Sequence, residues 1–221
     1  LIRLGSRKYN EAFLQDSSEN LWLRSQRGLF KVRENQGTSS FDVQQYQHEP
    51  GNAFSLSSDT IHALLYDSCH RLWVGSHNGL NFYDKEKDKM VRLEGGCHAP
   101  VTSLCETSSG KICIGTKNNG LCVYDPKTDI FSSYLPETDN GFSIAGKWVK
   151  QIVRDGKGNI WLLSGSSRTN VMSLQRFDPD KGEFRSYFEP FEPTGYNPAA
   201  AFLLFVDRMG FLWMVTGLGL K

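Results

Sequence analysis

The residues best suited to catalysis are five histidines, and their spacing does not favour a reaction centre. They lie at positions 48, 62, 70, 77 and 98. They form no H-E-x-x-H motif and no paired-histidine spacing of the kind that holds zinc. The chain also has no G-x-S-x-G nucleophile elbow and no phosphate-binding P-loop. The sequence therefore predicts no catalytic residue, no metal site and no cofactor.

The cysteines are expected to be structural. There are five, at positions 69, 97, 105, 113 and 122, and no C-x-x-C motif occurs. Cys105, Cys113 and Cys122 stand where related stretches of the chain have apolar residues, so we expect buried thiols there. Cys69 lies in a polar turn and should be exposed. An oxidising compartment would permit a disulfide, but the spacing does not require one.

A different set of residues could bind a ligand without reacting with it. The set combines aromatic, amide and charged side chains from three long connections and one hairpin: Asp59, Lys147, Trp148, Arg168, Tyr196 and Asn197. An aromatic ring can stack on the C–H face of a sugar while polar groups hydrogen-bond its hydroxyls. The alternative is that Trp148 and Tyr196 only pack against the ends of structural elements. The choice depends on the elements that position them.

Those elements repeat along the chain. An apolar-Trp pair recurs at intervals of 40 to 52 residues, with its second residue at Trp22, Trp73, Cys113, Trp161 and Trp213. Six residues earlier stands a second marker: Asp16, Asp67, Thr107, Asp155 and Asp207. A fixed internal period of this length is typical of a repeat architecture. The Asp is expected to cap a turn, and the Trp to pack between repeats with a partner for its N–H.

Each repeat contains four short strand-like runs, as in "IHALLYD", "LWVGS", "LNFYD" and "MVRLE". An Asn-Gly hairpin separates the second run from the third. Four strands in about 40 to 50 residues is the size of a β-propeller blade. We therefore predict an all-β propeller segment of four-stranded antiparallel blades. Complete blades are expected near residues 10–46, 61–93, 101–134 and 149–188, with a partial blade at 201–221.

The innermost strands are expected at 61–66, 101–106, 149–154 and 201–206. In a propeller, the connection into each innermost strand lies on the same face as the hairpin between the second and third strands. The candidate ligand-binding residues should therefore share one face. Function is expected there, because loops held by a rigid scaffold commonly carry it.

Composition narrows the class of protein. The chain has 221 residues, of which 39% are hydrophobic and 22% charged, and its formal net charge is +1. This is typical of a globular protein. No basic stripe indicates nucleic acid. No apolar run reaches the roughly 18 residues of a membrane helix, so any membrane span is expected outside this segment.

The stretch "DSCHRLWVGSHNGLNFYD" resembles the two-component regulator propeller repeat. "TSSGKICIGTKNNGLCVYD" and "DGKGNIW" resemble it less closely. Departures from the repeat occur at Thr107, Cys113, Arg24, Leu163 and Val215. The resemblance covers nearly the whole chain and implies a fragment of a propeller of about seven blades.

The same resemblance implies a function. It implies the periplasmic sensor region of a hybrid two-component histidine kinase from a Bacteroides-type bacterium, on the periplasmic side of an inner-membrane protein. The implied ligand is an oligosaccharide, the implied parent is a homodimer, and the implied output is transcription of glycan-use genes. Two alternatives stay open. One is a protein-binding scaffold, although the WD-repeat signature is absent. The other is a propeller enzyme, a lyase or quinoprotein, although no acid–base group supports it.

Overall fold

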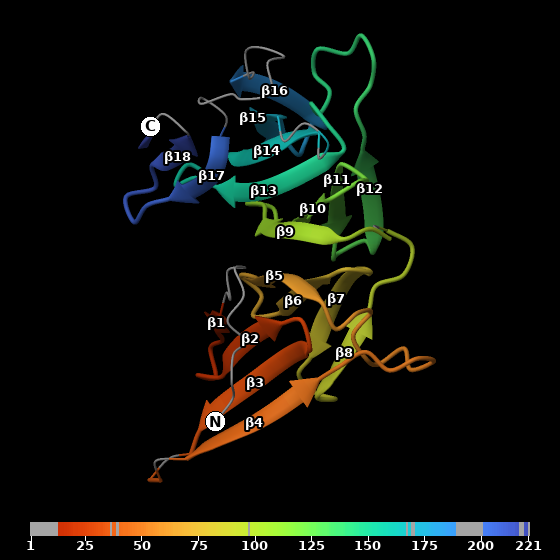
Figure 1. Ribbon diagram of the computed structural model, residues 1–221, viewed down its shortest axis with the longest axis vertical. Coiled ribbons are helices and arrows are strands. Elements are labelled where there is room, and N and C mark those ends of the chain that lie inside the picture. Colours follow the sequence, from red (N-terminus) through yellow and green to blue (C-terminus); the bar gives the residue numbers. More distant parts are fainter. Residues whose placement is uncertain are drawn as a thin grey trace.

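The computed structural model describes residues 13–35, 37–38, 40–96, 98–166, 168, 171–188, 201–216 and 219–220. Within these residues the chain forms strands and turns and no helix, arranged as five antiparallel sheets (Figure 1). Four sheets have four strands and the last has three. We call the sheets blades 1 to 5 in chain order. The predicted all-β propeller architecture is confirmed.

Strand bounds follow the repeat. Blade 1 contains β1 (Phe13–Gln15), β2 (Leu21–Ser25), β3 (Gly28–Glu34) and β4 (Phe41–Tyr46). Blade 2 contains β5 (Ile61–Tyr66), β6 (Leu72–Ser76), β7 (Gly79–Asp84) and β8 (Lys89–Arg92). Blade 3 contains β9 (Val101–Glu106), β10 (Ile112–Thr116), β11 (Leu121–Asp125) and β12 (Ile130–Tyr134). Blade 4 contains β13 (Trp148–Arg154), β14 (Ile160–Ser166), β15 (Val171–Asp178) and β16 (Glu183–Phe188). Blade 5 contains β17 (Ala201–Val206), β18 (Leu212–Thr216) and β19 (Gly219–Leu220).

Adjacent blades meet along their first strands. β5 contacts β9, β9 contacts β13, and β13 contacts β17, so these strands follow one another along the inner side of the array (Figure 1). Three of the four predicted innermost strands have the predicted bounds, and β13 begins one residue earlier, at Trp148. The order within each blade is sequential, as hairpin-connected antiparallel strands require.

The turn between the first two strands explains the Asp-Trp spacing. In blades 1, 2, 4 and 5 the Asp carboxylate accepts a hydrogen bond from the indole N–H at 2.8 Å. Its other oxygen accepts two backbone N–H groups of the turn, for example those of Cys69 and Arg71 at Asp67. Burial alone would raise the pKa of Asp155, but hydrogen bonds from Asn159 and Trp161 lower it. One carboxylate therefore fills both predicted roles: it caps the turn and it accepts the hydrogen bond of the indole N–H.

The Trp rings pack between blades, as expected from their size. Trp22 of blade 1 lies edge-on to Tyr83 of blade 2, with ring centroids 4.8 Å apart. Trp73 of blade 2 lies edge-on to Tyr124 of blade 3 at 5.7 Å. Both Trp side chains are buried. The repeated indole is therefore an architectural residue.

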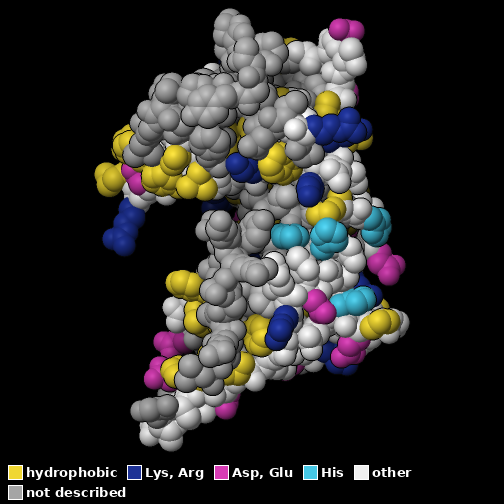
Figure 2. Space-filling model, viewed as in Figure 1, with side chains coloured by type: hydrophobic (Ala, Val, Ile, Leu, Met, Phe, Trp, Pro, Cys, Tyr) yellow, Lys and Arg dark blue, Asp and Glu magenta, His cyan; other side chains and the backbone are white. Residues whose placement is uncertain are grey.

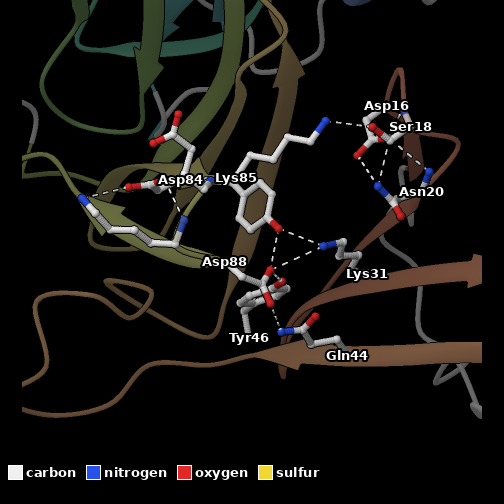
Figure 3. Close-up of polar contacts among 12 residues, drawn as sticks. Asp16, Ser18, Asn20, Lys31, Gln44, Tyr46, Asp84, Lys85 and Asp88 are labelled. Atoms are coloured by element: carbon white, nitrogen blue, oxygen red, sulfur yellow. Dashed lines mark hydrogen bonds and ion pairs between the residues drawn. The ribbon is translucent and has the colours of Figure 1, made fainter.

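Polar contacts also join the blades. Asp88, in the turn between β7 and β8, accepts hydrogen bonds from the hydroxyls of Tyr46 at 2.6 Å and Tyr83 at 2.5 Å (Figure 3). Gln44 donates to its second oxygen at 2.8 Å, and the Lys31 ammonium lies 3.4 Å from the first. Burial alone would raise the pKa of Asp88, but these partners hold it well below its usual value. The cluster links blade 1 to blade 2.

Candidate functional site

The candidate ligand-binding face is built from hairpins tied to the connections that enter the next strands. Gly28, in the β2–β3 hairpin, donates its N–H to the Asp59 carbonyl at 2.7 Å, and Gly120, in the β10–β11 hairpin, donates to the Lys147 carbonyl at 2.8 Å. His77, in the β6–β7 hairpin, donates its backbone N–H to the Thr60 carbonyl at 2.9 Å. The hairpins and the connections therefore lie on one face, as the sequence predicts. Figure 2 shows histidine side chains on one face of the molecule, with Lys, Arg, Asp and Glu side chains around them.

Glycine is required in these hairpins for two reasons. Gly28 and Gly120 have φ of 102° and 64°, in the left-handed region. A Cβ on Gly28 would lie 2.2 Å from the Tyr46 carbonyl oxygen, and one on Gly120 would lie 2.1 Å from that of Tyr134. The hairpin backbone thus fits closely against the outermost strand. These close contacts hold the hairpins of the candidate ligand-binding face in a fixed position.

Among the predicted ligand-binding residues, Asp59 has a local partner. Its carboxylate accepts the backbone N–H of His48 at 2.6 Å, and the side chain is half-buried. This contact closes the connection between β4 and β5. Asp59 therefore has one oxygen committed to holding the loop.

Trp148 and Lys147 are adjacent in the sequence but differ in exposure: Trp148 is half-buried and Lys147 is exposed. Trp148 is the first residue of β13 and packs against the buried cluster that contains Leu163 and Leu204. The Lys150 ammonium lies 5.9 Å from the Trp148 ring centroid. Lys147, the preceding residue, is exposed. The sequence analysis places Trp148 just before the strand, whereas the structure makes it part of the strand and of its packing.

Arg168 is exposed in the β14–β15 hairpin, where its backbone N–H contacts the Ser166 hydroxyl at 3.3 Å. Tyr196 and Asn197 lie outside the described residues. The structure thus places Asp59, Lys147 and Trp148 on connections into innermost strands and Arg168 on a hairpin. These four positions belong to the elements that form the candidate face.

Two loops of this molecule share a pattern that the sequence analysis missed. Glu49 and Glu137 each begin an E-x-x-N-x-F-S segment, in the connections after blades 1 and 3. In the first, Asn52 donates to the Glu49 carboxylate at 2.6 Å and accepts the Phe54 N–H at 2.9 Å. The second loop repeats these contacts at 2.7 Å and 2.9 Å. The spacing of Glu, Asn, Phe and Ser is the signal that could have identified them.

Each loop presents a phenylalanine to solvent. Phe54 is 50% exposed and Phe142 is 60% exposed, while the next apolar residues, Leu56 and Ile144, are buried. Both connections project from the body of the molecule (Figure 1). The loops are therefore preformed by their own hydrogen bonds, with an aromatic ring at the tip.

The cysteines divide into three kinds. Cys105 and Cys113 are buried free thiols, as predicted, and burial raises the pKa of Cys105 to about 12. Cys69 is exposed, also as predicted. Cys122 was expected to be a buried thiol; it is buried, but it is disulfide-bonded. Residue spacing carries no signal for this bond, because a disulfide depends on the approach of two Cβ atoms in space.

Metal-ligand clusters and membrane-spanning helices are both absent from the described part of the chain. No three His, Cys, Asp or Glu side chains there come together as metal ligands. No helix in the same residues is long and apolar enough to span a membrane.

Similarity to known proteins agrees with this geometry. Residues 55–78 match the family described as two component regulator propeller. Over 167 residues the chain is 31% identical to histidine kinase P4 of Formosa agariphila. That alignment covers 69% of this chain and 12% of the kinase.

Solved structures share the fold. The extracellular domain of BT4673 from B. thetaiotaomicron, described as a hybrid two component system, has a TM-score of 0.72 at 21% identity. The match covers 92% of this chain and 28% of that one. The extracellular domain of BT3049 from the same organism has a TM-score of 0.62 at 18% identity, covering 97% of this chain and 34% of that one. A streptogramin B lyase has a TM-score of 0.63 at 14% identity, covering 93% and 61%.

At these identities the solved structures establish the fold alone. The chain spans about a third or less of the two extracellular domains and a much smaller part of the kinase. The chain therefore carries the two component regulator propeller repeat, is homologous to a histidine kinase, and has the fold of the extracellular domains of two component systems.

Proposed function

We propose that this chain is part of the extracellular sensor propeller of a hybrid two-component histidine kinase. The observation that carries the proposal is the 31% identity with a histidine kinase over 167 residues, together with the propeller repeat at 55–78. The parent protein would be a homodimer whose histidine kinase activity responds to a ligand and which regulates transcription of glycan-use genes. Ligand binding would act by favouring one arrangement of the dimer over another.

The location proposed is the periplasmic side of an inner membrane. The disulfide at Cys122 supports it, because disulfides persist in oxidising compartments and are rare in the cytosol. The buried thiols Cys105 and Cys113 do not argue against it, since residues in a packed core are protected from oxidants.

The ligand proposed is an oligosaccharide bound at the hairpin face. Lys147 and Arg168 offer exposed charged groups, and the half-buried Trp148 offers an aromatic ring. Asp59 belongs to a connection that enters the same face. Tyr196 and Asn197, outside the described residues, stand in the sequence between β16 and β17 and complete the proposed set. A stacking ring beside hydrogen-bonding groups is the usual chemistry of sugar recognition.

The test uses the full-length protein and calorimetry against a panel of oligosaccharides. Because Trp148 packs against the buried cluster that contains Leu163, replacing it with Ala would open a cavity; Trp148→Leu keeps apolar contact and removes the ring. Loss of the stacking surface should weaken binding by about tenfold, equivalent to about 1.4 kcal/mol. Phe54→Leu, which removes an aromatic ring from a connection outside the proposed set, serves as the matched control.

Two results would contradict the sugar proposal. One is a folded full-length protein that binds no oligosaccharide in the panel. The other is a sugar that binds wild type and Trp148→Leu equally well, which would remove this residue from the site.

A protein-binding scaffold is the second candidate, and the exposed Phe54 and Phe142 favour it. Aromatic side chains at the tips of preformed loops are suited to anchoring a protein partner. Under this candidate Phe54→Leu would weaken partner binding, whereas Trp148→Leu would not. The same two variants therefore separate the two functions.

A further inference from the structure

The interfaces between successive blades are filled in different ways. Between blades 1 and 2 the filling is polar: the Asp88 carboxylate of blade 2 accepts hydrogen bonds from Lys31, Gln44 and Tyr46 of blade 1 (Figure 3). Between blades 2 and 3 it is apolar: Phe82 takes the place of Lys31 and packs against the buried cluster that these blades share. Between blades 3 and 4 the corresponding space is a cavity.

The strand registers show which side chains are missing there. Tyr134 pairs with Leu121 at the end of β12, just as Tyr46 pairs with Leu29 at the end of β4. Counting from these pairs, blades 3 and 4 have smaller residues at three positions: Val123 for Lys31, Ser132 for Gln44 and Gly182 for Asp88. The tyrosine is therefore retained at this interface, and the ammonium, amide and carboxylate that accompany it between blades 1 and 2 are not.

The cavity has a volume of about 150 Å³, and we call it the blade 3–4 cavity. It is lined by Val123, Ser132 and Tyr134, together with Lys111, Asp125 and, from the β15–β16 turn of blade 4, Pro179. Lys111 comes just before β10, whereas the β10–β11 hairpin follows that strand, so the cavity lies at the opposite end of the blade from the hairpin face. A void of this size accepts a ring of six carbon atoms, so a ligand of about six to eight non-hydrogen atoms fits.

The cavity contains one charge of each sign. Lys111 and Asp125 stand opposite each other on neighbouring strands, one residue beyond the last pair of β10 with β11, yet they form no ion pair with each other or with any other described residue. One Asp125 oxygen accepts the Lys127 backbone N–H at 2.9 Å, and the other accepts no hydrogen bond from the described residues. The Tyr134 hydroxyl has no hydrogen-bond partner among them either, whereas that of Tyr46 donates to a carboxylate. An ammonium, a carboxylate and a phenol are therefore available to a ligand.

We propose that the blade 3–4 cavity binds a small zwitterion, an α-amino acid of about six to eight non-hydrogen atoms. The interface between blades 1 and 2 holds an ammonium and a carboxylate side by side, those of Lys31 and Asp88, 3.4 Å apart. An α-amino acid carries the same two groups on one carbon atom. It would bring to this interface the groups that Val123 and Gly182 do not provide.

Each group of such a ligand has a partner in the cavity. The carboxylate would accept a hydrogen bond from the Tyr134 hydroxyl and lie near the Lys111 ammonium, while the ammonium would face Asp125. A ligand held there would join blade 3 to blade 4, as the Asp88 carboxylate joins blade 2 to blade 1. The cavity is separate from the hairpin face, and its occupation does not depend on the ligand proposed there.

The test is a ligand-observed NMR titration of the full-length protein with L-alanine and L-serine. Two matched probes each lack one charge of L-alanine: propionate has no ammonium, and ethylamine has no carboxylate. The amino acid should bind at least about tenfold more tightly than either probe, because only it satisfies both charges of the cavity. It should also raise the thermal unfolding temperature, since it binds the folded protein alone.

Two variants remove one group each and leave the packing in place. Asp125→Asn keeps an acceptor for the Lys127 N–H and removes the charge, so it should weaken L-alanine binding by about tenfold and leave propionate unchanged. Tyr134→Phe keeps the ring that packs edge-on to Phe177 and Phe184 and removes the hydroxyl, so it should weaken L-alanine binding by about tenfold. Circular dichroism checks that both variants are folded.

A third variant fills the cavity, and a fourth is the control. Ser132→Gln, at an exposed position, places the side chain of Gln44 at the equivalent point of blade 3 and should abolish binding. Asp84→Asn is the matched control, because Asp84 occupies the position of Asp125 in blade 2 and accepts backbone N–H groups of the same turn, away from the cavity. It should leave L-alanine binding unchanged.

Several results would overturn the proposal. One is the absence of binding by L-alanine and L-serine at concentrations up to about 10 mM. Another is propionate or ethylamine binding as tightly as L-alanine, which would mean that the cavity does not recognise a zwitterion. Binding that neither Asp125→Asn nor Tyr134→Phe weakens would place the amino acid elsewhere. An equal loss with Asp84→Asn would show a general effect of charge and not a site.

Discussion

Blades 2 and 3 have the same strand order and the same bulge, but they close their first turn with different residues. The backbone of the turn is alike: the N–H of Asp67 donates to the Arg71 carbonyl at 3.0 Å, and that of Thr107 donates to the Lys111 carbonyl at 2.8 Å. The side chains differ. Asp67 accepts four hydrogen bonds, including one from the Trp73 indole, whereas the Thr107 hydroxyl accepts the Lys111 N–H.

This difference shows what the carboxylate is for. Cys113 replaces the Trp in blade 3 and has no indole N–H, so no second acceptor is needed there. The space is filled from blade 4, whose Phe177 and Phe184 stack at 4.7 Å in the cluster that contains Cys113. The turn itself requires only a cap, and the buried indole requires the carboxylate.

The largest effect is expected when the cap is removed from blade 2. Asp67→Ala leaves the buried Trp73 N–H and two backbone N–H groups without this acceptor, so the free energy of unfolding should fall by about 3 kcal/mol. Thr107→Ala removes one hydrogen bond and should cost about 1 kcal/mol. Urea unfolding followed by tryptophan fluorescence and circular dichroism measures both. Equal losses for Asp67→Ala and Thr107→Ala would show that the hydrogen bond to the indole does not add to stability.

The second prediction isolates the indole. Trp73→Phe keeps an aromatic ring in the core but removes the donor to Asp67, and should lower the free energy of unfolding by about 1.5 kcal/mol. In an Asp67→Thr background the same change should cost less, because the acceptor has already gone. A double-mutant cycle measures this coupling. Additive losses would contradict a direct Asp67–Trp73 interaction.

The third prediction concerns the turn between the third and fourth strands, where Asp88 of blade 2 accepts hydrogen bonds from four side chains and Asp129 of blade 3 accepts one, from Tyr124. The folded-state pKa of Asp88 lies below the unfolded value of about 4, so its stabilising effect is present above pH 4 and is lost as the pH falls below it. Asp88→Asn should lower the free energy of unfolding at pH 7 by about 1 kcal/mol, a modest value because the carboxylate is half-exposed.

Urea unfolding at several pH values between about 2 and 7 tests this. The difference between wild type and Asp88→Asn should shrink as the pH falls below about 4. A difference that stays constant across this range would exclude a role for the Asp88 charge. Asp129→Asn, which affects one hydrogen bond, provides the comparison in blade 3.

The smallest effect is expected when blade 3 is given the turn residues of blade 4. Tyr124 and Asp129 correspond to Phe177 and Gly182, and both Asp129 and Gly182 have positive φ, 58° and 72°. The double change Tyr124→Phe with Asp129→Gly loses a hydrogen bond but relieves the strain of a positive φ at position 129. The free energy of unfolding should therefore change by no more than about 0.5 kcal/mol. Asp129→Gly alone should cost more. A large loss in the double variant would show that the hydroxyl–carboxylate bond, and not the backbone, determines this turn.

The sequence was informative wherever a contact lies within one blade. The Asp and Trp markers recur at fixed spacing, so strand positions such as β5 and β9 could be predicted closely. Contacts between blades have no such signal. Tyr46 and Asp88 are 42 residues apart, and Arg24 and His62 are 38 apart, so their pairing depends on how neighbouring sheets pack.

The candidate ligand-binding residues show the same limit. The hairpin face could be predicted from propeller topology, but the surroundings of each residue on it could not. Asp59 holds a loop through the His48 N–H, and Trp148 packs against the buried cluster that contains Leu163 and Leu204. A polar or aromatic residue is expected at such a position whether it binds a ligand or holds the structure together. Only its contacts with neighbouring parts of the chain distinguish the two roles.

The Asp-Trp turn also bears on how such a chain can evolve. Its carboxylate and indole are six residues apart in the sequence of every blade that has them. A duplicated segment of DNA that encodes one blade would therefore bring a complete Asp-Trp pair with it, and a deletion of one blade would leave the Asp-Trp pairs of its neighbours intact. Arrays of this kind can gain or lose whole blades by recombination. Selection then has to adjust only the contacts between neighbouring blades, such as that of Tyr46 with Asp88.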